Sequence, residues 1–232
     1  MKILLLGGAG FIGTNLVIEL SKTKQNEITV VDRKEQYFEP LKELGLSTVS
    51  FVESDLTLET DYVSLLKDYE LVYHLVSTTI PGTSNQHISE ELVANVVTTS
   101  KILEASVTAG VKKMVFISSG GTVYGKEVDC PIKETALTRP ITSYGVQKIS
   151  IENLLYLYNY MYGLDYRIIR LANPYGPYQR PNGMLGAVTT FTYKALKSEE
   201  IIVYGDGSVV RDYIYIDDSI RAIESIVKGD NK

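Results

Sequence analysis

Four glycines stand close together directly after the first apolar run of the chain, Lys2–Leu6. They are Gly7, Gly8, Gly10 and Gly13, and a segment of helical period follows them. Glycine in such a place permits a tight turn, a close approach of the backbone to a pyrophosphate, and close packing of helix on strand. The helix N-terminus then offers free N–H groups and a partial positive charge to phosphate oxygens. The segment therefore predicts a dinucleotide-binding turn, and a turn that serves packing alone is the alternative.

An acidic residue at the end of the second predicted strand supports the binding interpretation. Asp32 lies 19 residues beyond Gly13, a distance at which dinucleotide-binding folds carry a carboxylate for the adenosine ribose. A carboxylate accepts hydrogen bonds from the ribose 2′-hydroxyl and repels a 2′-phosphate, so we expect NAD rather than NADP. Arg33 next to it works in the opposite direction, because an arginine can pair with a phosphate.

A phenol and an ammonium, those of Tyr144 and Lys148, are one helical turn apart. A cation beside a phenol favours the phenolate, so such a pair can supply a base close to neutral pH. Spacing alone is weak support, since the pattern recurs at Tyr193 and Lys197. Position separates the two pairs, because Tyr144 follows a strand whose end is rich in small hydroxyl residues. We interpret Tyr193 and Lys197 as a chance match.

Short runs rich in valine and isoleucine alternate with longer segments of helical period, which is the pattern of a parallel sheet covered by helices. We expect strands near Lys2–Leu6, Ile28–Asp32, Thr48–Val52, Leu71–Leu75, Lys113–Ser118 and Tyr166–Leu171. We expect helices near Ile12–Lys22, Tyr37–Leu44, Tyr62–Lys67, Ile88–Ala109 and Tyr144–Met161. The predicted fold class is therefore α/β, a doubly wound parallel sheet of the Rossmann type.

The pattern changes after Leu171, where prolines and glycines crowd residues 174–186 and predict a long loop. Beyond the loop we expect a helix near Leu185–Leu196, strands near Ile201–Tyr204 and Tyr213–Ile216, and a last helix that ends at Val227 and has Asp217 or Asp218 as its N-cap. We divide the chain into a dinucleotide-binding domain, residues 1–171, and a small, incomplete substrate-binding part, residues 172–232, of which residues 201–228 pack back on the core.

Composition excludes several classes of protein. The 232 residues carry 23 basic and 28 acidic side chains, a net charge of −5 that argues against a nucleic-acid-binding module. No apolar run approaches the roughly 18 residues that span a bilayer, and the opening run is too short for a signal peptide, so we expect a cytoplasmic protein without a membrane partner. Cys130 is the single cysteine, and neither His74 nor His87 has partners at ligand spacing, so we expect no metal site.

Taken together, these residues resemble the extended short-chain dehydrogenase/reductase family, in its nucleotide-sugar epimerase and dehydratase branch of the UDP-glucose 4-epimerase type. The resemblance covers essentially the whole chain. Its motifs are the glycine segment, Asp32, Asp55, the Ser118–Gly125 segment, Tyr144 with Lys148, Asn173-Pro174-Tyr175-Gly176-Pro177 and the Arg211–Asp218 segment. It implies NAD as the cofactor and a nucleotide sugar, UDP-linked, as the substrate.

The resemblance also assigns roles to single residues. It implies a cofactor site made of Gly7, Gly10, Phe11, Ile12, Gly13, Asp32, Arg33, Asp55, Leu56, Leu75, Val76, Ser77, Asn95, Ser118, Tyr144 and Lys148. Lys148 would bind the nicotinamide ribose and, together with the cationic ring, lower the pKa of Tyr144, the catalytic base. Asn173 and Arg211 would hold the diphosphate of the substrate, a role that suits an arginine fork.

The chain departs from this family in the segment before Val123. The family's catalytic serine or threonine falls on Gly120 here, so either Ser119 or Thr122 must supply the catalytic hydroxyl. The family's dehydratases and decarboxylases carry an acid directly before the valine, where this chain has Gly121 and Thr122. Elimination of water needs an acid at the leaving hydroxyl. We therefore expect a C4 epimerase, with a ketoreductase or dehydratase of the same family as the alternative.

The resemblance further implies a homodimer, formed through a four-helix contact of the predicted 88–109 and 144–161 helices. Family members usually continue past the Arg211–Asp218 segment into elements that complete the sugar pocket. A chain that stops at Lys232 leaves a second hypothesis, in which it binds NAD and a nucleotide sugar without turnover, because an open pocket exposes the sugar to water.

Overall fold

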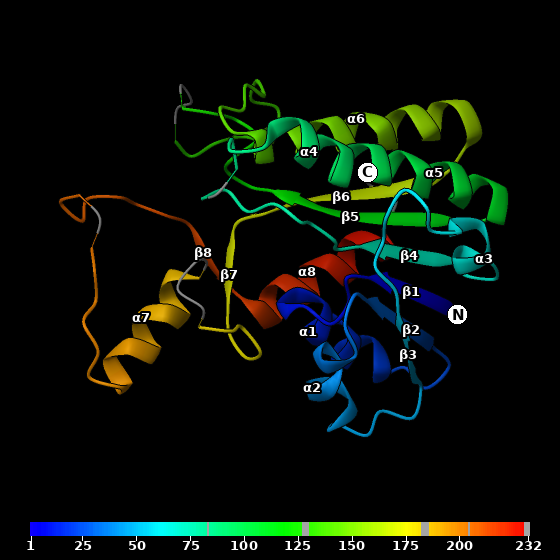
Figure 1. Cartoon of the computed structure of the whole chain (residues 1–232), viewed down its shortest axis with the longest axis horizontal. Coiled ribbons are helices and arrows are strands. Elements are labelled where there is room, and N and C mark those ends of the chain that lie inside the picture. The colour runs from blue at the N-terminus through cyan, green and yellow to red at the C-terminus, as the bar shows by residue number, and fades with distance from the viewer. Residues whose placement is uncertain (83, 127–129, 182–185, 204, 230–232) are drawn as a thin grey trace.

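One parallel sheet organises the molecule in a computed structural model that describes residues 1–82, 84–126, 130–181, 186–203 and 205–229 (Figure 1). Its strands lie in the order β3-β2-β1-β4-β5-β6, and every neighbouring pair is parallel. Their bounds are Lys2–Leu6 (β1), Glu27–Asp32 (β2), Val49–Glu53 (β3), Leu71–His74 (β4), Lys113–Ser119 (β5) and Asp165–Leu171 (β6). The order reverses between β1 and β4, which confirms the predicted doubly wound topology.

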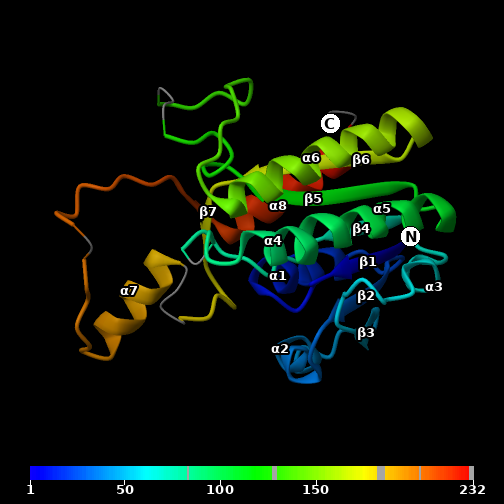
Figure 2. The same cartoon turned by 45° about the horizontal axis from the view of Figure 1, so that its top comes forward.

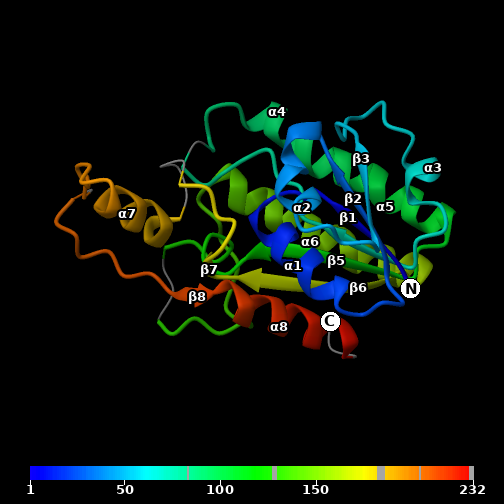
Figure 3. The ribbon, with the colours of Figure 1, turned by 90° about the horizontal axis from the view of Figure 1, so that it is seen from below.

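Helices cover both faces of this sheet. One face carries α1 (Phe11–Ser21), the short α2 (Glu39–Lys42) and α8 (Ile216–Lys228), and the other carries α3 (Tyr62–Leu66), α5 (Thr98–Ala109) and α6 (Ser143–Tyr162). In Figure 3, which shows the molecule from below, α1 and α8 lie side by side against the sheet. None of the helices in the described part of the chain is long and apolar enough to cross a membrane.

The first strand shows why the sheet is buried on both faces. Ile3 and Leu5 belong to the core cluster with α1 and α8, whereas Leu4 and Leu6 belong to the cluster with α5 and α6. All four side chains are fully buried, since successive residues of a strand point to opposite faces. An uninterrupted apolar run is therefore what a central parallel strand requires.

Two predicted helices are less regular than expected. The predicted Tyr37–Leu44 helix is a 3-10 turn, Glu35–Tyr37, followed by the short α2, in which Pro40 stands in the first turn. The predicted Ile88–Ala109 helix consists of α4 (Ile88–Leu92), a π-helical stretch (Val93–Val97) and α5. A π-helical stretch widens the turn locally and is frequent at functional sites.

The region after β6 differs most from the prediction. A strand that the sequence did not predict, β7 (Asn173–Tyr175), lies inside the predicted loop and pairs in parallel with β8 (Tyr213–Tyr215). The strand predicted at Ile201–Tyr204 is wrong for Ile201–Val203, which are exposed and lie in no strand; Tyr204 lies outside the described residues. This apolar run has no neighbouring strand edge to pair with, and Figure 2 shows it beside α7 (Ala187–Leu196), away from the main sheet.

The ends of two helices also need correction. The predicted start of α7, Leu185, lies outside the described residues, and the helix begins at Ala187. The last helix begins at Ile216, so Asp217 and Asp218 stand in its first turn rather than at the N-cap. There they still face the positive end of the helix dipole. Ile216, Ile220, Ile223 and Val227 then join the core cluster beneath the sheet.

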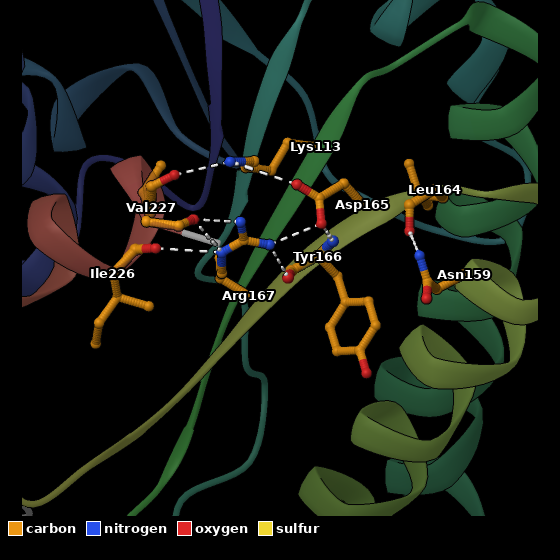
Figure 4. Close-up of polar contacts among 9 residues, drawn as sticks. Lys113, Asn159, Leu164, Asp165, Tyr166, Arg167, Ile226 and Val227 are labelled. Atoms are coloured by element: carbon orange, nitrogen blue, oxygen red, sulfur yellow. Dashed lines mark hydrogen bonds and ion pairs between the residues drawn. The ribbon is translucent and has the colours of Figure 1, made fainter. Parts of the chain in front are cut away.

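A buried arginine fastens the end of this last helix to the sheet (Figure 4). Arg167 of β6 is 2% exposed, and its Nε donates to the carbonyls of Ile226 and Gly229, each at 3.2 Å. Its Nη1 pairs with the Asp165 carboxylate at 2.7 Å. Nearby, Lys113 Nζ donates to the Val227 carbonyl at 2.8 Å. Two cations therefore satisfy carbonyls at the negative end of α8.

We predict that Arg167→Ala lowers the free energy of unfolding by about 3 kcal/mol, because it leaves buried carbonyls and a carboxylate without their partner. Urea denaturation measures the loss. The matched control is Arg221→Ala on the exposed face of α8, whose ion pair with Asp218 is solvent-exposed and should contribute less than about 1 kcal/mol. Equal stability of the Arg167 variant and the wild type would contradict the anchoring role.

Candidate functional site

The glycine segment closes the gap between the two strands at which the sheet order reverses. Gly7 has a φ of +77°, and a Cβ there would lie 2.9 Å from Val76 Cγ2 and 3.0 Å from Val76 N. A Cβ on Gly13 would lie 2.4 Å from the Gly8 carbonyl oxygen. Any side chain at Gly7 or Gly13 would force the backbone apart, so these two glycines let the loop after β1 approach the loop after β4 and let α1 begin against the turn.

The turn also has the features that a dinucleotide pyrophosphate needs. A Cβ on Gly10 would meet a single neighbour, Gly7 O at 3.6 Å, so the outer side of the turn is open. No side chain of the described residues caps the start of α1, which leaves its first N–H groups available. Asp32 Oδ2 accepts the Ala9 N–H at 3.1 Å, which fixes the turn and keeps the carboxylate at the end of β2. These residues fit a dinucleotide whose ribose hydroxyls approach Asp32.

Two arginines lie against one tyrosine at this end of the cleft. The Arg33 guanidinium carbon lies 5.7 Å from the centre of the Tyr37 ring, and that of Arg180 lies 5.1 Å from it. Asp32 Oδ1 accepts the backbone N–H of Arg33 at 2.9 Å. The sequence singled out Arg33 and missed Arg180, because Arg180 comes from the segment after β7 and reaches Tyr37 only in the folded chain.

Five more of the predicted cofactor residues lie in the loops that follow β3 and β4. Leu75 and Val76 are half-buried after β4, and Ser77 is exposed and donates to the Thr79 carbonyl at 2.9 Å. Asp55 is exposed after β3, whereas Leu56 packs against the core cluster beneath α5. The structure thus gathers these five residues along the carboxyl edge of the sheet, where ligands of open α/β folds bind.

Asn95 acts on the wall of the cleft from the π-helical stretch. It is buried, and its Oδ1 accepts the Thr78 N–H at 2.9 Å. Its Nδ2 donates to Thr78 Oγ1 at 2.9 Å, to Thr79 Oγ1 at 3.0 Å and to the Glu91 carbonyl at 2.9 Å. These partners use the whole amide, so the side chain holds the loop after β4 in place rather than offering a free group to a ligand.

Tyr144 and Lys148 both lie in the first turns of α6, beside the end of β5. Lys148 is buried, and its Nζ donates to the Ile117 carbonyl at 2.8 Å. The same nitrogen lies 4.6 Å from the centre of the Phe116 ring and 5.4 Å from the centre of the Tyr144 ring. A carbonyl and the faces of two aromatic rings therefore solvate the ammonium in place of water.

Burial dominates the ionisation of both groups. It lowers the pKa of Lys148 to about 8, against the opposing effect of the Glu152 carboxylate. It raises the pKa of the Tyr144 phenol. In the polypeptide by itself, the pKa of Tyr144 is therefore raised, whereas the resemblance implies that it is lowered. The Lys148 ammonium donates its hydrogen bond to a carbonyl and not to the phenol, so the cost of desolvating the phenolate exceeds the stabilisation that the ammonium provides.

The segment after β5 separates the two candidate hydroxyls. Thr122 Oγ1 is buried and has no hydrogen-bond partner. Ser119 is partly exposed at the end of β5, and its Oγ accepts the Thr122 N–H at 3.4 Å, which leaves its own proton free. A Cβ on Gly120 would lie 3.0 Å from the Arg170 carbonyl oxygen, so a serine or threonine at this position would crowd the backbone of β6. A Cβ on Gly145 would lie 2.5 Å from the Thr122 carbonyl oxygen, so α6 packs directly against this segment.

Ser118 and its surroundings differ from the expectation. Ser118 is buried, and its Oγ donates inward to Glu152 Oε1 at 2.5 Å, so its hydroxyl is already used within the protein. Glu152 also pairs with Arg170, whose Nη1 donates to the Tyr124 hydroxyl at 2.9 Å. Sequence reasoning missed this cluster, although Glu152 stands four residues after Lys148, on the same helix face.

The two predicted substrate residues come together through the β7–β8 pairing. Asn173 Nδ2 donates to the Asp212 carbonyl at 2.9 Å, and Asn173 pairs with Tyr213 in register. Arg211 is exposed, and its Nη1 donates to the Val210 carbonyl at 2.8 Å. Both side chains therefore lie at the same end of the small sheet, although 38 positions separate them in sequence.

Of the residues that the sequence set aside, His74 lies next to the site, since its ring packs against that of Phe116. His74 is buried with its Nε2 at 2.8 Å from Thr99 Oγ1, and His87 is exposed. No group of three or more histidine, cysteine or acidic residues suitable for a metal ion occurs in the part of the chain that the structure describes. Tyr193 and Lys197 are exposed on α7 and at its end, and α7 does not pack against the main sheet (Figure 2).

Comparison with known proteins adds to this geometry. Residues 3–231 match the model of the NAD dependent epimerase/dehydratase family. The UDP-glucose 4-epimerase of Mycolicibacterium smegmatis is 34% identical over 225 residues, which are 96% of this chain and 72% of that protein. Two solved structures each match 100% of this chain: the Thermotoga maritima UDP-glucose 4-epimerase with UDP-glucose (TM-score 0.89, 36% identity, 75% of its chain) and the Bacillus cereus UDP-glucuronic acid 4-epimerase with UDP-glucuronic acid and NAD (0.88, 30%, 74%).

We predict that Lys148→Met stabilises the unliganded protein at pH 7. The native state holds an ammonium whose pKa is lowered to about 8, so below pH 8 its burial costs up to about 3 kcal/mol relative to the unfolded chain. As the pH rises from 8 towards 10.5, the native state loses this proton first, wild-type stability increases, and the advantage of the variant disappears. Urea denaturation at pH 7 and pH 10 measures both effects. Lys197→Met, at an exposed lysine, is the control, and an equal response of the two variants would contradict the prediction.

Proposed function

The chain belongs to the NAD dependent epimerase/dehydratase family, and we propose that it epimerises a UDP-linked hexose at C4. The observation that carries the proposal is the position of Tyr144 and Lys148 in the first turns of α6, where Lys148 Nζ donates to the Ile117 carbonyl two residues before Ser119 at the carboxyl end of β5. The proteins of this family named above as 4-epimerases bind UDP-glucose or UDP-glucuronic acid. A UDP-sugar is therefore the substrate class that we propose for this chain.

The protein supplies the orientation of the cofactor, and the cofactor supplies the redox chemistry. Gly10 and the start of α1 hold the pyrophosphate, Asp32 binds the adenosine ribose, and Lys148 binds the nicotinamide ribose. When bound, NAD⁺ offers a reversible hydride acceptor, and its positive charge lowers the pKa of a nearby phenol. With this second cation, the Lys148 ammonium offsets the burial that raises the pKa of Tyr144 in the polypeptide alone.

Tyr144 acts as the base and later as the acid. As the phenolate it takes the proton of the C4 hydroxyl while the C4–H bond gives up its electron pair as hydride, which leaves a ketone at C4. Ser119 donates a hydrogen bond to the C4 oxygen, where negative charge develops. When the keto sugar presents its opposite face, the hydride that the bound cofactor would have accepted would return to C4, and Tyr144 would return the proton to the C4 oxygen, so that the inverted alcohol would form. Asn173 and Arg211 hold the diphosphate, so that the sugar can rotate while the nucleotide stays bound.

We assign the catalytic hydroxyl to Ser119 rather than Thr122. The Thr122 hydroxyl is buried and cannot meet a ligand where it stands, whereas Ser119 is partly exposed at the strand end. The Thr122 N–H polarises the Ser119 oxygen and so makes Ser119 a better donor. Gly120 fits this assignment, because a hydroxyl residue there would crowd the backbone of β6.

Epimerisation is favoured over dehydration by what surrounds the reacting centre. A Cβ on Gly121 would meet no atom within 4 Å, so an acidic side chain would fit there, yet the chain carries glycine. Without an acid at this position nothing in the segment protonates a leaving hydroxyl. A reductase would use the same residues and differ in consuming NADH, and binding without turnover would give no product, so both remain outcomes of the test.

The test is product analysis by NMR with UDP-glucose, UDP-galactose, their N-acetyl analogues and UDP-glucuronic acid. We expect interconversion of C4 epimers without added NADH, and a loss of about 10³-fold or more in kcat for Tyr144→Phe. Net consumption of NADH would identify a reductase instead. Binding of UDP-sugar without any product would support the non-catalytic hypothesis.

A pair of variants tests the choice of hydroxyl. Ser119→Ala should lower kcat about 10²-fold, since one hydrogen-bond donor to the developing oxyanion is lost. Thr122→Val is the matched control and should leave kcat within about twofold, because the hydroxyl that it removes makes no hydrogen bond. The reverse order of effects would transfer the role to Thr122.

We also propose a homodimer formed by α6 and by the helical rod that α4, the π-helical stretch Val93–Val97 and α5 make up together. Val93 and Val97 on the rod and Val146 and Leu157 on α6 are each 42–44% exposed, and the two helical elements pack side by side. The four apolar side chains recur at the spacing of one helix face. A second copy of the same surface buries them by two-fold symmetry, with helices of both subunits forming a four-helix contact.

The dimer predicts a specific loss of assembly. Val97→Arg should give a monomer by light scattering after size exclusion, because a charge in the centre of an apolar contact is not paired, and should leave the thermal unfolding of the isolated subunit unchanged. Val209→Arg, at an exposed valine outside this surface, serves as the control and should behave as the wild type. A wild-type monomer at concentrations of about 100 μM would refute the proposal.

A further inference from the structure

Glu152 is a buried carboxylate that the proposed chemistry does not use. It lies in α6, is 8% exposed, and accepts a hydrogen bond from Ser118 Oγ at 2.5 Å. The Arg170 guanidinium donates to it from Nη2 at 2.6 Å and from Nε at 3.1 and 3.3 Å. Charge-assisted hydrogen bonds therefore occupy both oxygens of this carboxylate.

Arg170 carries the connection to the other side of the site. Its Nη1 donates to the Tyr124 hydroxyl at 2.9 Å and to the Glu134 carbonyl at 3.0 Å. Tyr124 is buried, and the guanidinium carbon lies 5.1 Å from the centre of its ring. In the sheet, Arg170 is the register partner of Ser118. One guanidinium thus contacts the segment 118–125 and the helix α6 at once.

The two ends of this network enclose Ser119. Ser118 precedes it directly and is held by Glu152, and Tyr124 lies five residues after it and is held by Arg170. The main chain of β6 tightens the same segment, since the Gly120 N–H donates to the Leu171 carbonyl at 2.7 Å. Both Ser119 and the helix that carries Tyr144 and Lys148 are therefore tied to one ion pair.

We propose that the Glu152–Arg170 ion pair is a positioning unit, which fixes the separation of Ser119 from Tyr144 and places a negative charge one helical turn from Lys148. This inference rests on the proposed function for the roles of Ser119 and Tyr144. Neither Glu152 nor Arg170 touches substrate or cofactor, and both act through the residues that they hold. A shift of about 1 Å in such a separation costs roughly 10²-fold in rate.

The charged groups around Lys148 determine in which direction its pKa moves when the charge of Glu152 is removed. His74 of β4 is held neutral, because burial lowers its pKa to about 3. Tyr144 and Glu152 flank Lys148 on its own helix, β5 contributes the Phe116 ring and the Ile117 carbonyl, and Arg170 of β6 reaches Lys148 through Glu152. Glu152 is the group whose charge raises the Lys148 pKa against burial. Loss of that charge should therefore shift the Lys148 titration to lower pH.

Two variants separate the positioning of Ser119 and Tyr144 from the effect of the Glu152 charge on Lys148. Glu152→Gln keeps the size of the side chain and removes the charge, so we expect the Lys148 titration to fall by about one pH unit and kcat to fall about tenfold, with KM within about twofold. Tyr124→Phe removes one hydroxyl and no charge at neutral pH, so kcat should fall about threefold while the Lys148 titration stays unchanged. An NMR titration of ¹³Cε-lysine-labelled protein reads Lys148 without turnover, with Lys148→Arg to identify its resonance.

The matched control lies on the same strand. Asp165→Asn removes the carboxylate that pairs with Arg167 at the opposite end of β6, and it should lower the melting temperature with no change in kcat, KM or the Lys148 titration.

If Glu152→Gln and Tyr124→Phe also change only the melting temperature, the ion pair is structural and the proposal is overturned. If Glu152→Gln does not fold, an unchanged kcat of Tyr124→Phe overturns it as well. A wild type inactive on every UDP-sugar would refute the proposed function, and the Lys148 titration would still decide the electrostatic part.

Discussion

Lys148 keeps a cationic nitrogen inside the molecule, and three elements are arranged around it. The nitrogen donates to the Ile117 carbonyl of β5, lies over the Phe116 ring, and has the Glu152 carboxylate one helical turn away. An ammonium without such partners would not remain charged at this depth. Because burial still lowers its pKa to about 8, the site contains a group that titrates near neutral pH, which an exposed lysine does not offer. The same burial that makes α6 part of the core therefore gives the site its acid–base character.

The region around the glycine turn depends on a different constraint, the close approach of two loops. The reversal of strand order puts β1 beside β4, so the turn after β1 meets the loop after β4 with no room for a side chain at Gly7. Asn95 secures the second loop through three hydrogen bonds, and Asp32 secures the first through the Ala9 N–H. Hydrogen bonds therefore hold both loops in the unliganded chain, which reduces the entropy that binding must overcome.

The last helix, α8, connects the main sheet to the small β7–β8 sheet. Arg167 and Lys113 hold the C-terminal end of α8 beneath the sheet, and β8 leads into its N-terminal end and pairs with β7. This pairing carries Asn173 and the Arg211 segment to one place. Here local sequence signals were misleading. The apolar run Ile201–Val203 has strand-like composition but no edge to pair with, whereas Asn173–Tyr175, with its central proline, forms a strand because β8 lies alongside.

By itself the sequence determined the parallel sheet, the place of the glycine turn and the helical spacing of Tyr144 and Lys148, because these follow from periodicity and from residue types that act over a few positions. It left Ser119 and Thr122 equivalent, and it missed the cluster of Glu152, Arg170 and Tyr124 and the stacking of Arg180 on Tyr37. Only the tertiary structure shows that the two hydroxyls differ in burial, and only it brings these other groups together. Whether a hydroxyl is buried, which carbonyl receives an ammonium, and whether desolvation or a neighbouring charge governs a pKa all depend on groups that are distant in the chain. The local pattern therefore specified which groups were present, and packing between distant segments specified their state of solvation and charge.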